Sequence, residues 1–494
     1  MLFNSVSFLI FFPVVVIIYA LIPRKLRAVW LLIASYYFYM SWNAKYAILI
    51  FISTLVTWAG ALFLDKTRAI FERKLALIAV FAVNLGILFL FKYYDFAVAT
   101  LNRALSLVHV APVDAALHVL LPVGISFYTF QALGYCVDVY RGDMRAERNL
   151  LRYALFVSFF PQLVAGPIER SQNLLTQIND IENKNIYNYD DIVSGLALML
   201  WGLFQKVVIA DRIAIVADTV FGSPWRYGAT ALILGACAFS VQIYCDFGAY
   251  SNIAVGAARV MGFRLMNNFD TPYFATGISD FWRRWHISLS TWFRDYLYIP
   301  LGGNRKGRVR RYLNLLITFL VSGLWHGAAW TFVAWGGLHG ILQILEDLLK
   351  KPFGRLEALL HVNVTAKSRK LLRMACTFAL VTLAWIFFRA ESLTDAVSFI
   401  RRMFTHIDPW NLFNGSVYTL GLDHFEAHVL FAALILLLMV DLLRYFRKEE
   451  LWDLLVRQNL WFRWGVMLAL LLGILVYGVY GAQFDSAQFI YFRF

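Results

Sequence analysis

The chain has 494 residues, of which 60% are hydrophobic, 17% are aromatic and only 15% are charged. Soluble domains carry about 25% charged residues, so this composition excludes an ordinary soluble protein and indicates a polytopic membrane protein. The 45 basic and 31 acidic residues give a net charge of +14. Because the excess lies in short loops between apolar segments, it fits the positive-inside rule better than nucleic-acid binding.

Apolar segments alternate with basic loops along the whole chain. The first covers residues 6–22, and the basic residues Arg24, Lys25 and Arg27 follow it. A signal peptide has its basic region before the apolar stretch, so this segment is predicted to be a retained span. Further segments cover residues 29–42, 44–64, 75–91, 117–140, 153–165, 191–220, 229–262, 312–345, 371–388, 428–443 and 462–480.

This alternation predicts the architecture. With every strongly basic loop in the cytoplasm, both termini lie outside. No repeat or linker divides residues 1–494, so we expect one all-α integral membrane domain of about 10–12 membrane helices. Residues 153–165 are too short to cross without tilt, and residues 245–256 and 336–340 are broken by glycine. Such backbone is tolerated at membrane depth only inside protein or along a water-filled cavity, which predicts re-entrant elements around a central tunnel.

His326 lies in the longest charge-free stretch, residues 312–345. An ionisable side chain at membrane depth is costly and suggests a functional role. Gly323 and Gly327 flank it in the motif S-G-L-W-H-G, and histidine is well suited to take a proton from a hydroxyl. The alternative is a structural histidine that bonds a neighbouring helix. His339 is expected on a nearly opposite face of a continuous helix, and we therefore interpret it as a packing residue.

A tryptophan-rich basic segment, residues 280–311, comes just before this stretch. Trp282 and His286 are four residues apart, which predicts a shared helix face. We expect His286 at the cytoplasmic mouth of the tunnel, near Arg283 and Arg284. The alternative is an interfacial helix whose tryptophans and arginines anchor at lipid headgroups.

The end of this segment, L-G-G-N-R-K-G-R-V-R-R, combines a double glycine with five basic residues. Glycine-rich turns and basic side chains bind phosphates, so Arg305, Lys306 and Arg308 are candidates for binding coenzyme A or anionic lipid. The order of a P-loop is missing, which argues against ATP. The cysteines have no metal-ligand or disulfide spacing, and no metal site is expected. Asp246 and Asp295 are isolated acids that we expect to pair with arginines.

Three motifs together are similar to a known family. They are M-G-F-R-L-M-N-N-F-D-T-P-Y (261–273), D-F-W-R-R-W-H-I-S-L-S-T-W-F-R-D-Y-L-Y-I-P-L-G-G-N-R (280–305) and S-G-L-W-H-G (322–327). The chain resembles the membrane-bound O-acyltransferase (MBOAT) family, in its bacterial branch that modifies alginate, peptidoglycan or teichoic acid. The segments LPVGISFYTFQ (121–131), FPQLVAGPIER (160–170) and QFIYFRF (488–494) are similar to the acetylating members.

The resemblance implies a ring of helices around a tunnel in the bacterial inner membrane. His326 matches the catalytic histidine of the family, and His286 matches its second motif histidine on the cytoplasmic side. Acetyl-CoA is the implied donor. A partner of the SGNH-hydrolase type is implied to modify an extracytoplasmic polysaccharide, either an alginate-like exopolysaccharide or peptidoglycan. The alternative function is a transporter or flippase for an anionic lipid or envelope precursor, for which internal repeats would be evidence.

Overall fold

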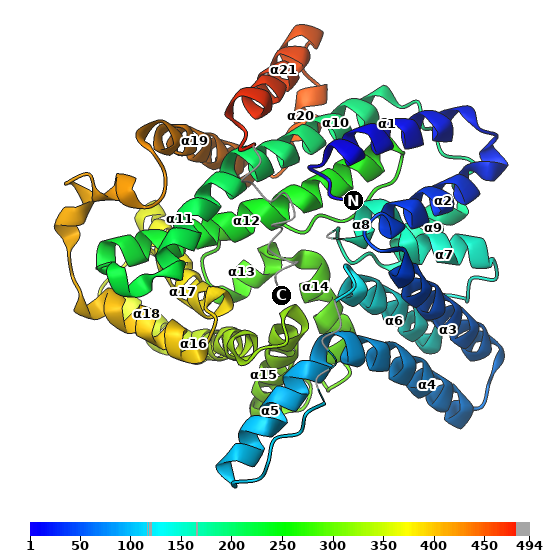
Figure 1. The fold of residues 1–494 in the computed structure, drawn as a ribbon, viewed down its shortest axis with the longest axis horizontal. Helices are drawn as coiled ribbons and strands as arrows, with labels where there is room; N and C mark the ends of the chain where they lie inside the picture. The colour runs from blue at the N-terminus through cyan, green and yellow to red at the C-terminus, as the bar shows by residue number, and fades with distance from the viewer. Residues whose placement is uncertain (116, 118–120, 165, 481–494) are drawn as a thin grey trace. The chain divides into compact units, whose positions relative to one another are not determined.

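The computed structural model describes residues 1–115, 117, 121–164 and 166–480, and every regular element in these ranges is a helix (Figure 1). Seven helical segments there are long and apolar enough to cross a membrane. They are Ala44–Lys66, Ile70–Leu107, Tyr189–Gly222, Ala229–Val260, Lys367–Arg389, His424–Arg447 and Leu460–Tyr477. The predicted all-α membrane class is therefore confirmed. The motif QFIYFRF and residues 118–120 and 165 of two predicted segments lie outside the described residues.

The contacts within the chain gather in two units, of which the first comprises Met1–Leu196 and Ala254–Met266. Its helices are α1 (Val6–Leu21), α2 (Arg27–Met40), α3 (Ala47–Lys66), α4 (Ile70–Leu88), α5 (Tyr94–Leu107), α6 (Ile125–Arg141), α7 (Leu150–Ser158), α8 (Phe160–Leu163) and α9 (Ser171–Asn179). The side chain of Ser5 caps α1 by accepting the Phe8 N–H over 3.2 Å. Glycines in the left-handed conformation bound α6, with φ of 75° at Gly124 and 82° at Gly142.

The short element predicted at residues 153–165 is interrupted within its described part, residues 153–164. Helix α7 ends at Ser158, Phe159 is non-helical, and the four-residue α8 follows. All residues from Tyr153 to Val164 are buried inside the first unit. The non-helical backbone is therefore surrounded by protein, the condition under which such backbone is tolerated at membrane depth.

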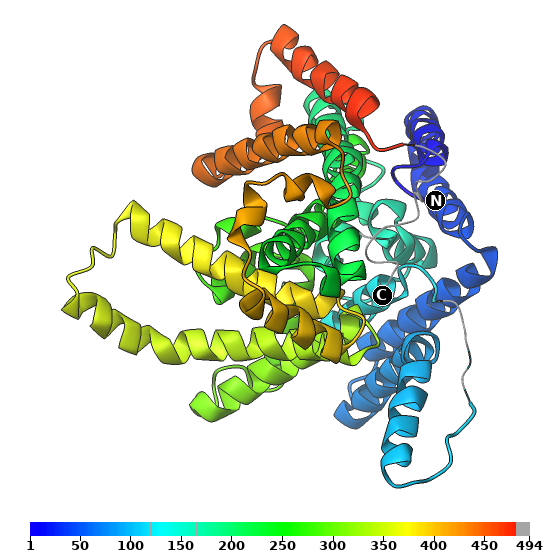
Figure 2. The ribbon, with the colours of Figure 1, turned by 60° about the vertical axis from the view of Figure 1, so that its left-hand side comes forward.

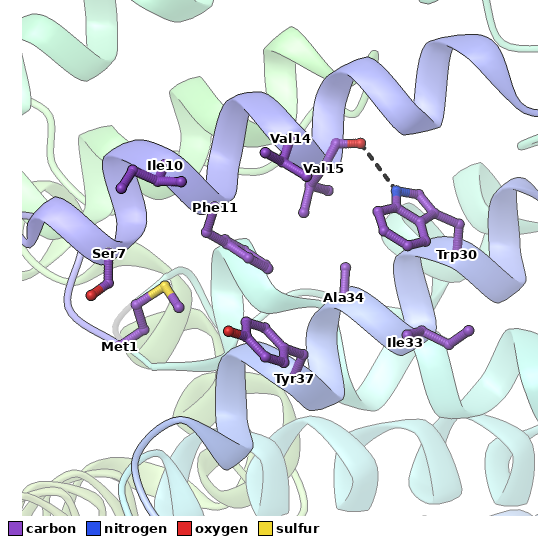
Figure 3. Close-up of a pocket in the computed structure, with 10 residues that line it drawn as sticks. All are labelled: Met1, Ser7, Ile10, Phe11, Val14, Val15, Trp30, Ile33, Ala34 and Tyr37. Carbon is purple, nitrogen blue, oxygen red and sulfur yellow. Dashed lines mark hydrogen bonds between the residues drawn. The ribbon is translucent and has the colours of Figure 1, made fainter.

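A hydrophobic groove of about 540 Å³ lies between α1 and α2 in this unit (Figure 3). Phe11 and Tyr37 stack across it with ring centroids 5.9 Å apart. Trp30 Nε1 donates to the carbonyl oxygen of Val15 over 3.0 Å. Its lining is mostly apolar and carries no acidic, basic or histidine side chain.

The second unit comprises Ala197–Ile253 and the chain from Asn267 on, with α10 (Tyr189–Phe204) and α12 (Ala229–Val260) shared between the units. Its other helices are α11 (Asp211–Gly222), α13 (Ile278–Arg284), α14 (Ile287–Phe293), α15 (Gly307–His326), α16 (Trp330–Leu359), α17 (Lys367–Arg389), α18 (Leu393–Thr405), α19 (His424–Arg447), α20 (Leu451–Val456) and α21 (Leu460–Tyr477). Helices α16 and α17 run alongside each other as a long pair (Figure 2).

A buried ion cluster joins two spans of this unit. Lys206 Nζ lies 2.8 Å from Asp211 Oδ1 and 2.7 Å from Asp246 Oδ1, and all three side chains are at most 4% exposed. Lys206 lies in the π-helical segment η4 (Gln205–Ala210) between α10 and α11. Hydrogen bonds in a π-helix join residues five apart, so Lys206 and Asp211 lie on the same face of the helix. Asp246 was expected to pair with an arginine, and the basic partner recorded for it is Lys206. Asp295 pairs with Arg294 over 2.7 Å, as expected.

Candidate active site

His286 lies at a sharp turn between two short helices. Helix α13 ends at Arg284, Trp285 is extended, and His286 has φ of 43° and ψ of 54° before α14 begins. Histidine tolerates this left-handed conformation better than most side chains. The predicted shared helix face of Trp282 and His286 is therefore wrong, because the helix is interrupted between them. The side chain of His286 is fully buried at 0% exposure, deeper than the expected position at an open tunnel mouth.

The loop before α13 holds this turn in place. The Asn268 carbonyl oxygen accepts the Ile287 N–H over 3.0 Å, and the Arg284 carbonyl oxygen accepts the Asp270 N–H over 2.9 Å. Asn268 Oδ1 also accepts the Ser288 hydroxyl over 2.6 Å. The motif at residues 261–273 therefore supports the motif that contains His286, which explains how two separate stretches of sequence act as one structural element.

His326 is the last residue of α15, and the chain then breaks before α16 begins at Trp330. Its side chain is 4% exposed. Helices α15 and α16 cross closely at two glycines: a Cβ on Gly323 would lie 2.2 Å from the Phe332 carbonyl oxygen, and one on Gly336 would lie 2.2 Å from that of Phe319. Gly323 is three residues from His326, so this crossing fixes the end of α15 that carries the histidine.

A methyl group at Gly323 should therefore disturb the site. We expect Gly323→Ala to destabilise the protein by about 1–3 kcal/mol, because backbone atoms that cannot move freely face the new Cβ. Gly86→Ala in α4 is the control, since a Cβ there would meet nothing within 4 Å. Thermal unfolding in detergent measures both variants. Equal unfolding temperatures for the two would contradict the close crossing.

The two motif histidines are neighbours. The ring centroids of His286 and His326 lie 6.1 Å apart, so they form one centre and do not occupy separate ends of a tunnel. Burial lowers the pKa of the His286 imidazole to about 3, and the ring is therefore neutral at physiological pH. The aromatic rings that surround the pair are Phe247, Trp325, Trp335 and Phe388.

His339 belongs to the same aromatic cluster. The ring of Trp335 lies 5.1 Å from that of His326 and 5.0 Å from that of His339. The expected opposite faces of His326 and His339 require one continuous helix, but the helix is broken after His326. His339 Nδ1 accepts the indole N–H of Trp282 over 3.2 Å, and its side chain is fully buried. We therefore still interpret His339 as a packing residue, whose hydrogen bond orients the side chain of Trp282.

The tryptophans of this segment face inward. Trp282, Trp285 and Trp292 are between 1% and 8% exposed. An interfacial helix would place its tryptophans at lipid headgroups. The anchor interpretation of the W-R-R-W-H segment therefore does not fit the structure.

A cavity of about 560 Å³ lies in the second unit, and its lining includes Ile287, which follows His286 in the chain, but neither His286 nor His326. It is formed by α13, α14, α15 and α16, and it reaches Ser322, about one helical turn before His326. Trp282 contributes an apolar wall, and Arg283 and Arg294 contribute positive charge. Because it combines apolar walls with a few polar groups, the cavity has the character of a ligand site.

The other basic candidates lie elsewhere. Arg284 donates to Asp280 Oδ1 over 3.1 Å and is held away from the cavity lining. Arg305 and Lys306 are exposed on the turn that leads into α15, and Arg308 is exposed in its first helical turn; all three are outside the lining. Arg294 was missed by the sequence argument, although its position eight residues after His286 in a basic motif was a usable signal.

The second unit of this membrane protein therefore holds a buried pair of neighbouring histidines and a cavity whose lining includes two arginines. The family model for MBOAT, the membrane-bound O-acyltransferase family, matches residues 145–357. A probable alginate O-acetylase of Pseudomonas syringae pv. tomato is 42% identical over 424 residues, which cover 83% of this chain and 76% of that protein. The chain therefore belongs to the membrane-bound O-acyltransferase family, and it is an O-acyltransferase rather than a transporter.

Two further relatives show the range of named activities. A peptidoglycan O-acetyltransferase of Helicobacter pylori is 36% identical over 433 residues, covering 82% of this chain and 80% of that protein. A teichoic acid D-alanyltransferase of Bacillus subtilis is 27% identical over 246 residues, covering 46% of this chain and 60% of that protein. The similarity is therefore more extensive to proteins named for acetyl transfer than to this D-alanyl transferase.

Proposed function

We propose that this chain takes acetyl groups from cytosolic acetyl-CoA and passes them across the inner membrane for O-acetylation of an extracytoplasmic polysaccharide. The acceptor is an alginate-like exopolysaccharide or peptidoglycan, as the names of the relatives suggest. The observation that carries the proposal is the cavity whose lining includes two arginines, Arg283 and Arg294, together with Ser322, which lies about one helical turn before His326 in α15. Its charge suits the phosphates of coenzyme A.

The chemistry requires few groups because a thioester is already activated. His326 takes the proton of the acceptor hydroxyl while the hydroxyl oxygen attacks the acetyl carbon. The bond between carbon and sulfur then breaks, and the thiolate receives the proton from His326. The neighbouring neutral ring of His286 orients the donor thioester. No separate nucleophile is needed, so direct transfer is favoured over an acyl-histidine intermediate.

The rest of the proposal concerns topology and partners. Both termini lie outside the cytoplasm, because the strongly basic loops face inward. A tunnel gives the acceptor hydroxyl access to the histidine centre from the outer side, and the acetyl group leaves as an ester on that oxygen. There an SGNH-hydrolase-like partner completes the transfer to the polysaccharide. Arg305, Lys306 and Arg308 lie on an exposed turn and attract the anionic donor or anionic lipid from solution.

Reversing the charge of the cavity arginines tests the donor site. Arg283→Glu and Arg294→Glu should each raise the KM for acetyl-CoA by roughly fivefold, since an exposed ion pair contributes up to about 1 kcal/mol. The effect should be larger at low salt, because salt screens exposed charges. The measurement is the rate of coenzyme A release by purified protein over a range of acetyl-CoA concentrations.

Two comparisons sharpen this test. The triple variant Arg305→Glu, Lys306→Glu, Arg308→Glu reports on the exposed turn. Arg401→Glu on α18 is a control for an exposed arginine outside both sets. An unchanged KM in the cavity variants, together with a raised KM in the triple variant, would move the donor site from the cavity to the turn.

A further inference from the structure

Asn268 is the polar side chain most closely tied to the His286 turn, and no motif argument singled it out. It is 1% exposed. Its backbone carbonyl oxygen bonds Ile287, and its side-chain oxygen Oδ1 accepts both the Ser288 hydroxyl at 2.6 Å and the Ser288 N–H at 3.4 Å. Both residues follow His286 directly in the chain. Asn268 therefore supports the backbone of the turn through its two oxygen atoms.

These bonds also fix the orientation of the Asn268 amide. A backbone N–H can only donate, so the atom that faces Ser288 N must be the oxygen. The amino group Nδ2 consequently points to a different environment. It is buried, and it makes no hydrogen bond to any group in residues 1–115, 117, 121–164 and 166–480. A buried amide donor without an acceptor is costly and needs an explanation.

A structural role explains only half of this arrangement. Asn268 Oδ1 is enough to hold Ser288, and an aspartate or a protonated carboxyl would do the same. Nδ2 therefore needs an acceptor that the described protein groups do not supply. The reaction does supply one, because a thioester carries a carbonyl oxygen that becomes negatively charged when the hydroxyl attacks. An amide N–H is a common donor to such an oxygen.

We propose that Asn268 is a catalytic residue of the acyl-transfer centre, whose amide N–H donates to the acyl carbonyl oxygen while its own oxygens hold the His286 turn. As the hydroxyl oxygen bonds to the acyl carbon, the carbonyl electron pair moves onto the oxygen that faces Nδ2. The pair returns when the bond between carbon and sulfur breaks. The proposal rests on the proposed acetyl transfer and adds to it the group that stabilises the developing charge.

The decisive variant is Asn268→Asp, which keeps an oxygen for Ser288 and removes the two N–H donors. We expect kcat for acetyl transfer to fall by roughly 10²–10³-fold, the usual effect of losing such a donor, with the KM for acetyl-CoA changed by less than about twofold. Ser288→Ala removes only the hydroxyl bond to Asn268 and should lower kcat by less than tenfold. Asn84→Asp is the matched control: Asn84 is also a buried asparagine that accepts a serine hydroxyl, from Ser53 over 2.5 Å, but its Nδ2 donates to the Val80 carbonyl oxygen.

The outcomes separate this proposal from the proposed function. Wild-type protein that transfers no acetyl group from acetyl-CoA would overturn both. Active wild-type protein with an Asn268→Asp kcat within fivefold of it would overturn the role of Asn268 alone. The same conclusion follows if Ser288→Ala loses as much kcat as Asn268→Asp, since turn geometry would then account for the loss.

A spectroscopic measurement covers the case in which Asn268→Asp does not fold. Infrared difference spectra of carbonyl-labelled [1-¹³C]acetyl-CoA bound to the His326→Ala variant report hydrogen bonding to the thioester carbonyl directly. We expect its stretching frequency to lie below that of the thioester in an aprotic solvent. A frequency equal to the aprotic value would contradict donation from Asn268.

Discussion

Replacing His326 by alanine is expected to lower acetyl transfer by roughly 10²–10⁴-fold, the usual loss on removing a general base. The protein should remain folded and inserted, because the ring lies at the end of α15 and its contacts with the rings of Trp325 and Trp335 are only part of a larger aromatic cluster. Release of coenzyme A and labelling of the acceptor measure the loss. Size-exclusion chromatography in detergent checks the fold.

His339→Ala provides the comparison for this variant. It removes an equally buried imidazole from the same aromatic cluster, together with the bond from Trp282. We expect it to lower the unfolding temperature and to reduce acetyl transfer far less than His326→Ala. Acetyl transfer in His326→Ala within about tenfold of the wild-type rate would rule out His326 as the general base.

The second large effect concerns the buried ion cluster. Lys206→Met should destabilise the protein by about 3–5 kcal/mol, since removing one partner of a buried ion pair leaves uncompensated charge. The loss of stability is larger than for a single ion pair, because both Asp211 and Asp246 lose the ammonium group that they contact. Two carboxylates that share a site repel each other unless one takes up a proton.

The triple variant Lys206→Met, Asp211→Asn, Asp246→Asn is the control for this prediction. It removes all three charges from the cluster, so most of the lost stability should return. Thermal unfolding of both variants in the same detergent measures the difference. A single Lys206→Met variant as stable as wild type would show that the cluster makes no net contribution to stability.

Local patterns were enough to predict much of the fold. The alternation of apolar segments and basic loops predicted an all-α membrane protein, and seven helical segments of the described residues are long and apolar enough to cross a membrane, although the charge-free stretch at residues 312–345 is not among them. The motifs around His286 and His326 led to the family that the relatives confirm. These features depend on composition and on neighbours in the chain. The break after His326 was harder to predict, because Gly327 is compatible with either a break or a continuous helix.

Tertiary features could not be predicted in the same way. Lys206 and Asp246 are forty positions apart in the numbering, and neither carries a local signal for the other. The turn at His286 depends on bonds from Asn268, which lies in a separate motif. The four-residue spacing of Trp282 and His286 predicts a shared face only if the helix is uninterrupted. Spacing alone gives no information about a turn that another segment imposes. Five basic residues were predicted to bind the donor, and only Arg283 among them lines the cavity. Helix packing decides which side chains face the cavity.

Reconstituted acetyl transfer tests the central claim most directly. Proteoliposomes that contain the purified chain and an SGNH-type partner would be given acetyl-labelled acetyl-CoA on the side of the basic loops, with an alginate-like polymer or peptidoglycan fragment on the other side. We predict that label reaches the polymer with wild-type protein and that His326→Ala abolishes this transfer while membrane integrity is maintained. Equal labelling with wild-type and His326→Ala proteins, or labelling without either, would contradict acetyl transfer through the histidine centre.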